Sequence, residues 1–183
     1  MADPAGRETE DHLLSTPATA TLSELAARLQ AIAISRAVTV GTAESCTGGL
    51  VGHSITSVPG SSAYYVGGVV SYSDALKERL LGVSQAAIER HGAVSAQVAV
   101  AMAHGVRDRT GCDYGVAVTG VAGPEGGSEA KPVGLTYVAT AGPDGDEVRR
   151  HVWTGGRGAN KQDSAAVALE MLRRVIGSAE AGA

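Results

Sequence analysis

Hydroxyl, amine and guanidinium side chains are the groups of this 183-residue chain that could do chemistry. Ser45 follows a short β-branched run and precedes Thr47-Gly48-Gly49, a pattern typical of a turn from a strand into a helix. Free backbone N–H groups at a helix start can hold a phosphate or a developing oxyanion, and glycines let a ligand approach them closely. The alternative is that Ser45 or Thr47 only caps the helix.

Cys46 is the rival nucleophile at this turn, because a thiolate attacks well when its pKa is lowered. Neighbouring residues at a strand end point to opposite faces, so Ser45 and Cys46 cannot easily serve the same cleft. A buried cysteine that packs as a small apolar group is the commoner case. We therefore favour Ser45 as the nucleophile.

A serine nucleophile needs a base, and none of the five histidines lies near the end of a predicted strand. This argues against a Ser-His-Asp triad and against a two-histidine metal site. Lys77 lies one turn into a predicted helix, and burial favours the neutral amine of a lysine, which can accept a proton. Tyr72, at the preceding strand end, could relay a proton or hold Lys77 in position. The structural alternative is a solvated helix lysine beside Glu78.

Two further segments could bind a substrate. Thr119 and Gly120 end a third predicted strand and lead into a Gly/Pro loop over residues 120–132. Loops of this length in compact domains are usually functional or disordered. Arg157 lies between two glycines at the start of the last predicted helix, where a guanidinium suits bidentate capture of phosphate or carboxylate. A loop arginine in water is the alternative.

The elements that must position these residues follow from hydrophobic periodicity and capping patterns. The last helix is predicted to be capped by Asn160 and stopped by Gly177. The patterns predict helices over residues 21–34, 47–57, 73–81, 84–91 and 95–110, and strands over 38–42, 64–72, 114–119, 134–141 and 147–153.

Three strands separated by helices imply parallel βαβ units, and the last two strands form an antiparallel hairpin. The predicted fold class is a three-layer α/β/α domain with a mixed, mostly parallel five-stranded sheet. Ligands of such sheets bind beyond the carboxyl ends of the strands. Ser45, Tyr72, Lys77 and Thr119 are therefore expected to face one cleft.

Length and composition bound the possible classes of protein. Residues 1–20 are expected to be a disordered acidic tail, 21–177 a single domain and 178–183 a short disordered end. A net charge of -4 and only six aromatic residues argue against direct contact with nucleic acid. No run approaches 18 uncharged apolar residues, so no membrane span is expected. Two cysteines and no signal-peptide pattern point to a cytoplasmic setting.

Taken together, the motifs resemble the C-terminal domain of the CinA family, which also occurs alone as nicotinamide mononucleotide (NMN) deamidase. The resemblance runs from about residue 38 to residue 176. The stretches that carry it are AESCTGG at 43–49, PGSS at 59–62, VSYS at 70–73 with Lys77, HGAVS at 91–95, TGVAGP at 119–124, Gly126-Gly127 and KPVG at 131–134.

The resemblance implies a serine amidohydrolase that converts NMN and water to nicotinate mononucleotide and ammonia, with neither metal nor organic cofactor. It implies that Ser45 is the nucleophile, Lys77 its base and Tyr72 an assisting group. It also implies a homodimer. The residues expected to bind the substrate, by backbone or side chain, are Cys46, Thr47, Gly48, Gly49, Thr119, Gly120 and Arg157.

One segment departs from the family pattern, which usually reads Gly-Asp-Arg with a second arginine four residues later. Here the segment reads Gly155-Gly156-Arg157, and Lys161 stands at the later position.

Two other functions remain possible from the sequence. One is a non-catalytic competence or DNA-damage accessory protein that acts through protein partners. The other is a general nucleotide-binding or phosphate-ester-cleaving protein.

Overall fold

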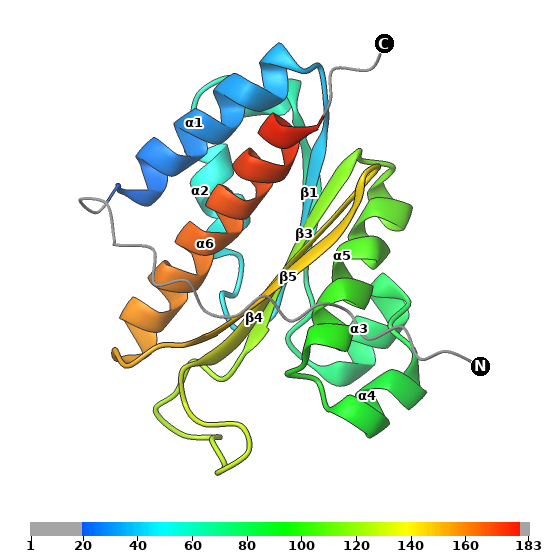
Figure 1. Cartoon of the computed structure of the whole chain (residues 1–183), viewed down its shortest axis with the longest axis vertical. Helices are drawn as coiled ribbons and strands as arrows, with labels where there is room; N and C mark the ends of the chain where they lie inside the picture. The colour runs from blue at the N-terminus through cyan, green and yellow to red at the C-terminus, as the bar shows by residue number, and fades with distance from the viewer. Residues whose placement is uncertain (1–19, 180–183) are drawn as a thin grey trace.

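The structure is a computed structural model that describes residues 20–179 (Figure 1). The predicted tail before residue 20 and the residues after 179 lie outside this range. None of the helices within the range is both long enough and apolar enough to cross a bilayer. The elements are α1 (Leu22–Ser35), β1 (Val40–Glu44), α2 (Leu50–Thr56), a 3-10 helix η1 (Ser61–Ala63), β2 (Tyr65–Val70), α3 (Asp74–Leu81), α4 (Gln85–His91), α5 (Ala96–Thr110), β3 (Tyr114–Gly120), β4 (Leu135–Gly142), β5 (Gly145–Val152) and α6 (Arg157–Ser178).

The five strands form one sheet in the order β2-β1-β3-β4-β5. β1 pairs in parallel with both β2 and β3, and β4 pairs antiparallel with β3 and with β5. β5 therefore runs in the direction of the first three strands, so four of the five point the same way. The predicted mixed, mostly parallel sheet is confirmed.

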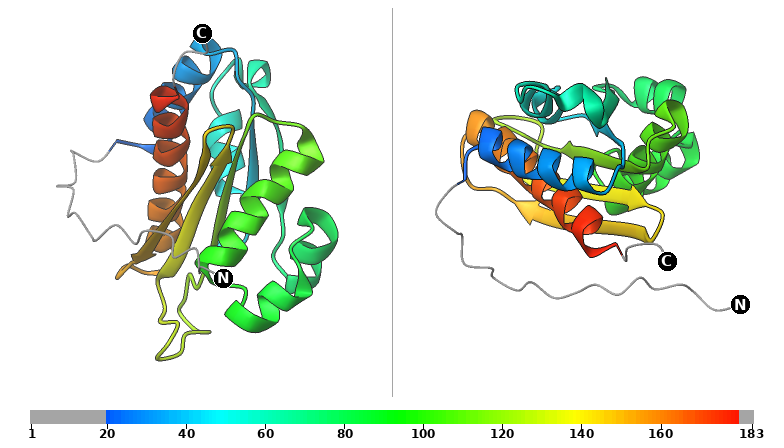
Figure 2. Two further views of the ribbon diagram at one scale, coloured as in Figure 1. Left: turned by 45° about the vertical axis from the view of Figure 1, so that its right-hand side comes forward. Right: turned by 90° about the horizontal axis from the view of Figure 1, so that it is seen from above.

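Helices cover both faces of the sheet, as Figure 2 shows from above. α1, α2 and α6 pack on one face, where Leu29, Ile55 and Leu172 belong to one buried apolar cluster. α3, α4 and α5 pack on the other face, where Leu81 and Met102 belong to a second cluster. This arrangement confirms the predicted three-layer α/β/α fold.

Helix starts follow the local capping rules in most places. Thr21 and Glu24 form a complete capping box at the start of α1. Ser73, Ser84 and Ser95 each accept a hydrogen bond from the backbone N–H three residues later, which caps α3, α4 and α5 as predicted.

Two helix starts differ from the prediction. α2 begins at Leu50 and not at Thr47, because Gly48 and Gly49 adopt left-handed backbone angles (φ +65° and +96°) that a helix cannot contain. α6 begins at Arg157, so Asn160 is not its cap. Asn160 is instead buried in the first turn of α6, and its side-chain amide donates to the carbonyl of Ala122.

Candidate functional site

Three strand ends lie next to one another at the carboxyl edge of the parallel part of the sheet. Glu44, the last residue of β1, is in register with Val70 of β2 and Val118 of β3. The ladders continue by one residue, because the N–H of Ser71 donates to Glu44 (2.8 Å) and that of Ser45 donates to Val118 (2.9 Å). Residues 71, 45 and 119 therefore form a row of three hydroxyl side chains across the sheet.

The Glu44 side chain caps the start of α2. Its carboxylate is 2% exposed and accepts hydrogen bonds from the backbone N–H groups of Gly49 (2.9 Å), Val51 (3.1 Å) and Gly52 (2.8 Å). Among the residues expected to bind a ligand at this turn, Gly49 therefore has its N–H occupied, because the protein supplies its own anion. The sequence signal for this role was a carboxylate at the end of a buried strand, five residues before the N-cap.

The turn over residues 45–49 keeps fewer donors for a ligand than expected. The N–H of Gly48 donates to the carbonyl of Ser45 (3.1 Å). The N–H groups of Cys46 and Thr47 donate to no oxygen atom of the described residues. Apart from their interaction with the Cys46 thiol, these two groups have no partner, and they directly follow Ser45, whose side chain is 8% exposed.

Cys46 lies in the buried apolar cluster beneath this turn. Burial raises the pKa of its thiol to about 11, and the nearby Glu44 carboxylate acts in the same direction. The N–H groups of Cys46 and Thr47 offset only part of this rise. The thiol is therefore protonated at neutral pH, which disfavours Cys46 as a nucleophile.

Lys77 is buried, so the alternative of a solvated helix lysine is wrong. Only 2% of it is exposed, and its Nζ donates to the backbone carbonyl of Ser71 at 3.2 Å. Asp74, about half exposed, contributes a carboxylate oxygen at 3.4 Å. Lys77 thus lies beside the strand end that neighbours Ser45, but Lys77 and Ser45 share no hydrogen bond.

Tyr72 lies apart from Lys77 and next to Arg157. The Tyr72 side chain is 59% exposed, and its hydroxyl accepts a hydrogen bond from Nη2 of Arg157 at 2.8 Å. Nη1 of Arg157 donates to the carbonyl of Gly123, also at 2.8 Å. Arg157 therefore connects the end of β2 to the loop that follows β3, while three of its five N–H donors remain for a ligand.

The first turn of α6 is the most cationic part of the site. Arg157 opens this 22-residue helix, and its N-cap residue Gly156 provides no side-chain cap. Lys161 lies one turn later, with its Nζ 3.5 Å from the position that a Cβ on Gly48 would occupy. Two cationic side chains at an uncapped helix N-terminus favour binding of an anion.

Thr119, Gly120 and Thr47 shape the remaining wall. The Thr119 hydroxyl is buried and donates to the carbonyl of Ala93, which holds the segment before α5. A Cβ on Gly120 would lie 2.6 Å from the carbonyl oxygen of Leu135, so only glycine fits at this strand end. The Thr47 hydroxyl is buried and has no hydrogen-bond partner.

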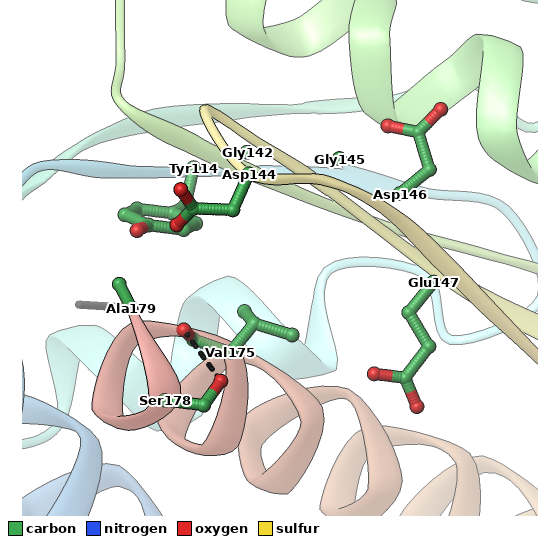
Figure 3. Close-up of a pocket in the computed structure, with 9 residues that line it drawn as sticks. All are labelled: Tyr114, Gly142, Asp144, Gly145, Asp146, Glu147, Val175, Ser178 and Ala179. Carbon is green, nitrogen blue, oxygen red and sulfur yellow. Dashed lines mark hydrogen bonds between the residues drawn. The ribbon is translucent and has the colours of Figure 1, made fainter.

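A surface hollow of about 350 Å³ lies elsewhere, between the β4–β5 turn and the end of α6 (Figure 3). Tyr114 in its wall begins β3, so the hollow lies at the amino ends of the parallel strands. Its carboxylates, from Asp144, Asp146 and Glu147, would repel a phosphate. The hollow is therefore a poor candidate for an anionic ligand. Within residues 20–179, no three His, Cys, Asp or Glu side chains gather into a metal site.

Comparisons with known proteins agree on one family. The model of the CinA C-terminal domain matches residues 22–176. A CinA-like protein from Parasynechococcus marenigrum is 47% identical over 170 residues, which are 92% of this chain and 40% of that protein. A CinA-like protein from Salinibacter ruber is 50% identical over 141 residues, 77% of this chain and 34% of that protein. The chain thus spans about two fifths or less of the length of these relatives.

Solved structures are similar over almost their whole length. The competence/damage inducible protein CihA from Agrobacterium tumefaciens is 39% identical, with a TM-score of 0.81 over 89% of this chain and 99% of that one. The competence damage-inducible protein A (ComA) from Klebsiella pneumoniae is 30% identical, with a TM-score of 0.85 over 88% and 100% of the two chains. This chain belongs to the CinA C-terminal domain family.

Proposed function

We propose that the chain is a nicotinamide-nucleotide amidohydrolase that converts NMN and water to nicotinate mononucleotide and ammonia. The observation that carries the proposal is the burial of Lys77 at the sheet edge where Ser45 lies. A fully buried lysine is rare unless it is paired, and its one carboxylate partner, Asp74, is about half exposed. A lysine held at this edge of the sheet is placed to accept a proton from a serine at the neighbouring strand end.

Ser45 is the nucleophile of the proposed reaction. Its Oγ attacks the carboxamide carbon of NMN while its proton passes to the Lys77 amine. The N–H groups of Cys46 and Thr47 stabilise the negative charge that develops on the carboxamide oxygen. The Lys77 ammonium then protonates the amide nitrogen, the C–N bond breaks with release of ammonia, and an acyl-enzyme ester remains. Water attacks this ester with Lys77 as base, and Ser45 regains its proton.

The 5′-phosphate of NMN has a matching cationic partner in this proposal. Arg157 and Lys161 at the N-terminus of α6 bind it, and Lys161 replaces the second arginine of the usual family pattern. Thr119 and Gly120 line the wall beneath the nucleotide. The donor set of the site needs no metal or organic cofactor for this chemistry.

The deciding experiment is ammonia release from NMN by the purified chain. The wild type is expected to turn over, Ser45→Ala to lose at least about a thousandfold in kcat, and Lys77→Ala about 10² to 10⁴-fold. Lys77→Arg is expected to be equally impaired, because a guanidinium stays protonated. The exposed Ser62→Ala is the matched serine control. A folded wild type without turnover, or an active Ser45→Ala, contradicts the proposal and favours a non-catalytic accessory role.

A further inference from the structure

The proposed reaction needs a proton path that a direct contact does not provide. A base must lie within about 2.6–3.2 Å of the proton it removes, or reach it through one intermediate group. Lys77 makes hydrogen bonds with Ser71 and Asp74, and none with Ser45. An intermediate group between Ser45 and Lys77 would complete this path.

Ser71 occupies the position between them. It follows β2 as Ser45 follows β1, and its N–H donates to Glu44, the residue before Ser45. Adjacent strands are about 4.8 Å apart, so the backbones at residues 45 and 71 are direct neighbours. The backbone of Ser71 also contacts the base, because the Ser71 carbonyl accepts a hydrogen bond from Lys77 Nζ at 3.2 Å.

The side chains of Ser45 and Ser71 belong to the same face of the sheet. Glu44 caps α2, and Val70 lies 3.6 Å from the position of a Cβ on Gly49, so both point toward the α2 face. Side chains alternate along a strand, so the residues that follow point to the opposite face. That face carries α3 and therefore Lys77.

The Ser71 hydroxyl is also unused by the fold. Ser71 is 0% exposed, and its Oγ has no hydrogen-bond partner. Buried polar groups are almost always paired, because an unpaired one destabilises the folded state. In this structure the Ser71 hydroxyl bonds to neither Ser45 nor Lys77, and it is free to pair with both when bound substrate tightens the site.

The neighbouring hydroxyls are less suited to this role. Tyr72 is mostly exposed, and its hydroxyl accepts a hydrogen bond from Arg157. The proton of the Thr119 hydroxyl is already donated to Ala93. Thr47 is unpaired like Ser71, but Lys77 makes no hydrogen bond with any of its atoms.

We propose that Ser71 is a catalytic proton relay between Ser45 and Lys77, an inference that rests on the amidohydrolase function proposed above. As Ser45 Oγ bonds to the carboxamide carbon, its proton moves to Ser71 Oγ, and the Ser71 proton moves to Lys77 Nζ. Ser71 ends the step as a neutral hydroxyl and Lys77 as an ammonium. The same path runs in reverse when the C–N bond breaks and the amine leaves as ammonia.

Steady-state kinetics of the Ser71→Ala variant with NMN as substrate test the relay. We expect kcat to fall at least about a hundredfold while KM changes less than threefold, and Ser71→Thr to restore most of kcat because it keeps a hydroxyl. The matched control is Ser73→Ala, which removes the cap of the helix that carries Lys77 but leaves Ser71 in place. A Ser71→Ala enzyme with unchanged kcat, or one no slower than Ser73→Ala, overturns the relay.

A second measurement separates the relay from the substrate. The rate at which a fluorophosphonate labels Ser45, followed by intact-protein mass, reports activation of the serine without NMN. Ser71→Ala and Lys77→Ala should slow labelling by similar factors, and Ser71→Thr should not. Labelling that depends on Ser71 without NMN turnover would retain the relay and reject the proposed substrate. No labelling of wild-type Ser45, or labelling slowed by Lys77→Ala but not by Ser71→Ala, overturns the relay.

Discussion

Arg157 donates a hydrogen bond to the Tyr72 hydroxyl at 2.8 Å, although 85 residues separate the two in sequence. The bond joins the first turn of α6 to the end of β2, across the edge of the sheet where Ser45 lies. Tyr72 is therefore a partner of the predicted phosphate-binding arginine, and it makes no hydrogen bond with the predicted base.

Tyr72→Phe is expected to act mainly on substrate binding. The variant removes one neutral acceptor from Arg157 but keeps the ring, and one such hydrogen bond contributes about 1 kcal/mol. We expect KM for NMN to rise about three- to tenfold with kcat within a factor of three, measured by steady-state ammonia release. A loss of a hundredfold in kcat at constant KM would instead assign Tyr72 to proton transfer.

Glu44→Ala is expected to destabilise the protein strongly. The change leaves three N–H groups at the start of α2 without their buried acceptor, at a cost of about 2–4 kcal/mol. Urea unfolding followed by circular dichroism measures this loss. Glu125→Ala, in the exposed loop after β3, is the control and should change the free energy of unfolding by less than about 0.5 kcal/mol. Equal stability of the two variants would contradict the capping role of Glu44.

Cys46 is expected to resist alkylation in the folded protein. With a pKa of about 11, about one thiol in a thousand is ionised at pH 8, against about a quarter for a free cysteine. Iodoacetamide should therefore modify Cys46 at least about a hundredfold more slowly than it modifies the unfolded chain in urea, as peptide mass spectrometry can show. The rate should rise tenfold per pH unit as long as the protein stays folded. Rapid alkylation at pH 7 would show that Cys46 is a reactive thiolate.

Glu147 is expected to contribute stability that depends on pH. Burial alone would raise the pKa of Glu147, but hydrogen bonds from Arg174 and Arg149 hold it below the ordinary value of 4.5. A lowered pKa adds stability at pH values above 4.5, and this part is lost as the pH falls through the lower folded value. Glu147→Gln should therefore lower the free energy of unfolding by about 0.5–1 kcal/mol at pH 7. The deficit should shrink below pH 4, and thermal unfolding at both pH values checks it; a constant deficit would contradict the ion pair.

Much of the fold was predictable because its signals are local. The capping box at Thr21, the serine caps of three helices and the order of strands and helices depend on residues within a few positions of each other. The start of α6 was mispredicted at Asn160, because the usual capping residue there makes its hydrogen bond to Ala122, 38 residues earlier. Local rules do not include such a partner.

The candidate site was also predictable only where its signals are local. Ser45, Lys77 and Arg157 stand out in the sequence as side-chain types at strand ends and helix starts. Glu44 gives only a weak signal, a carboxylate at the end of a buried strand, and Ser71 gives none, because their importance comes from the groups that they contact in the fold.

By itself, the sequence determined which segments become strands and helices and which reactive groups lie at their ends, since both depend on near neighbours along the chain. Only the tertiary structure decided how those groups are paired. The register between β1 and β2 sets Ser45 beside Ser71, whose carbonyl accepts a hydrogen bond from Lys77, and the assembled fold brings Tyr72 to Arg157. Packing of α2 against β1 places the Glu44 carboxylate, and not a ligand, at the N–H groups of the helix start. These pairings join residues brought together only when the sheet and its helices assemble, which is why no short segment contains them.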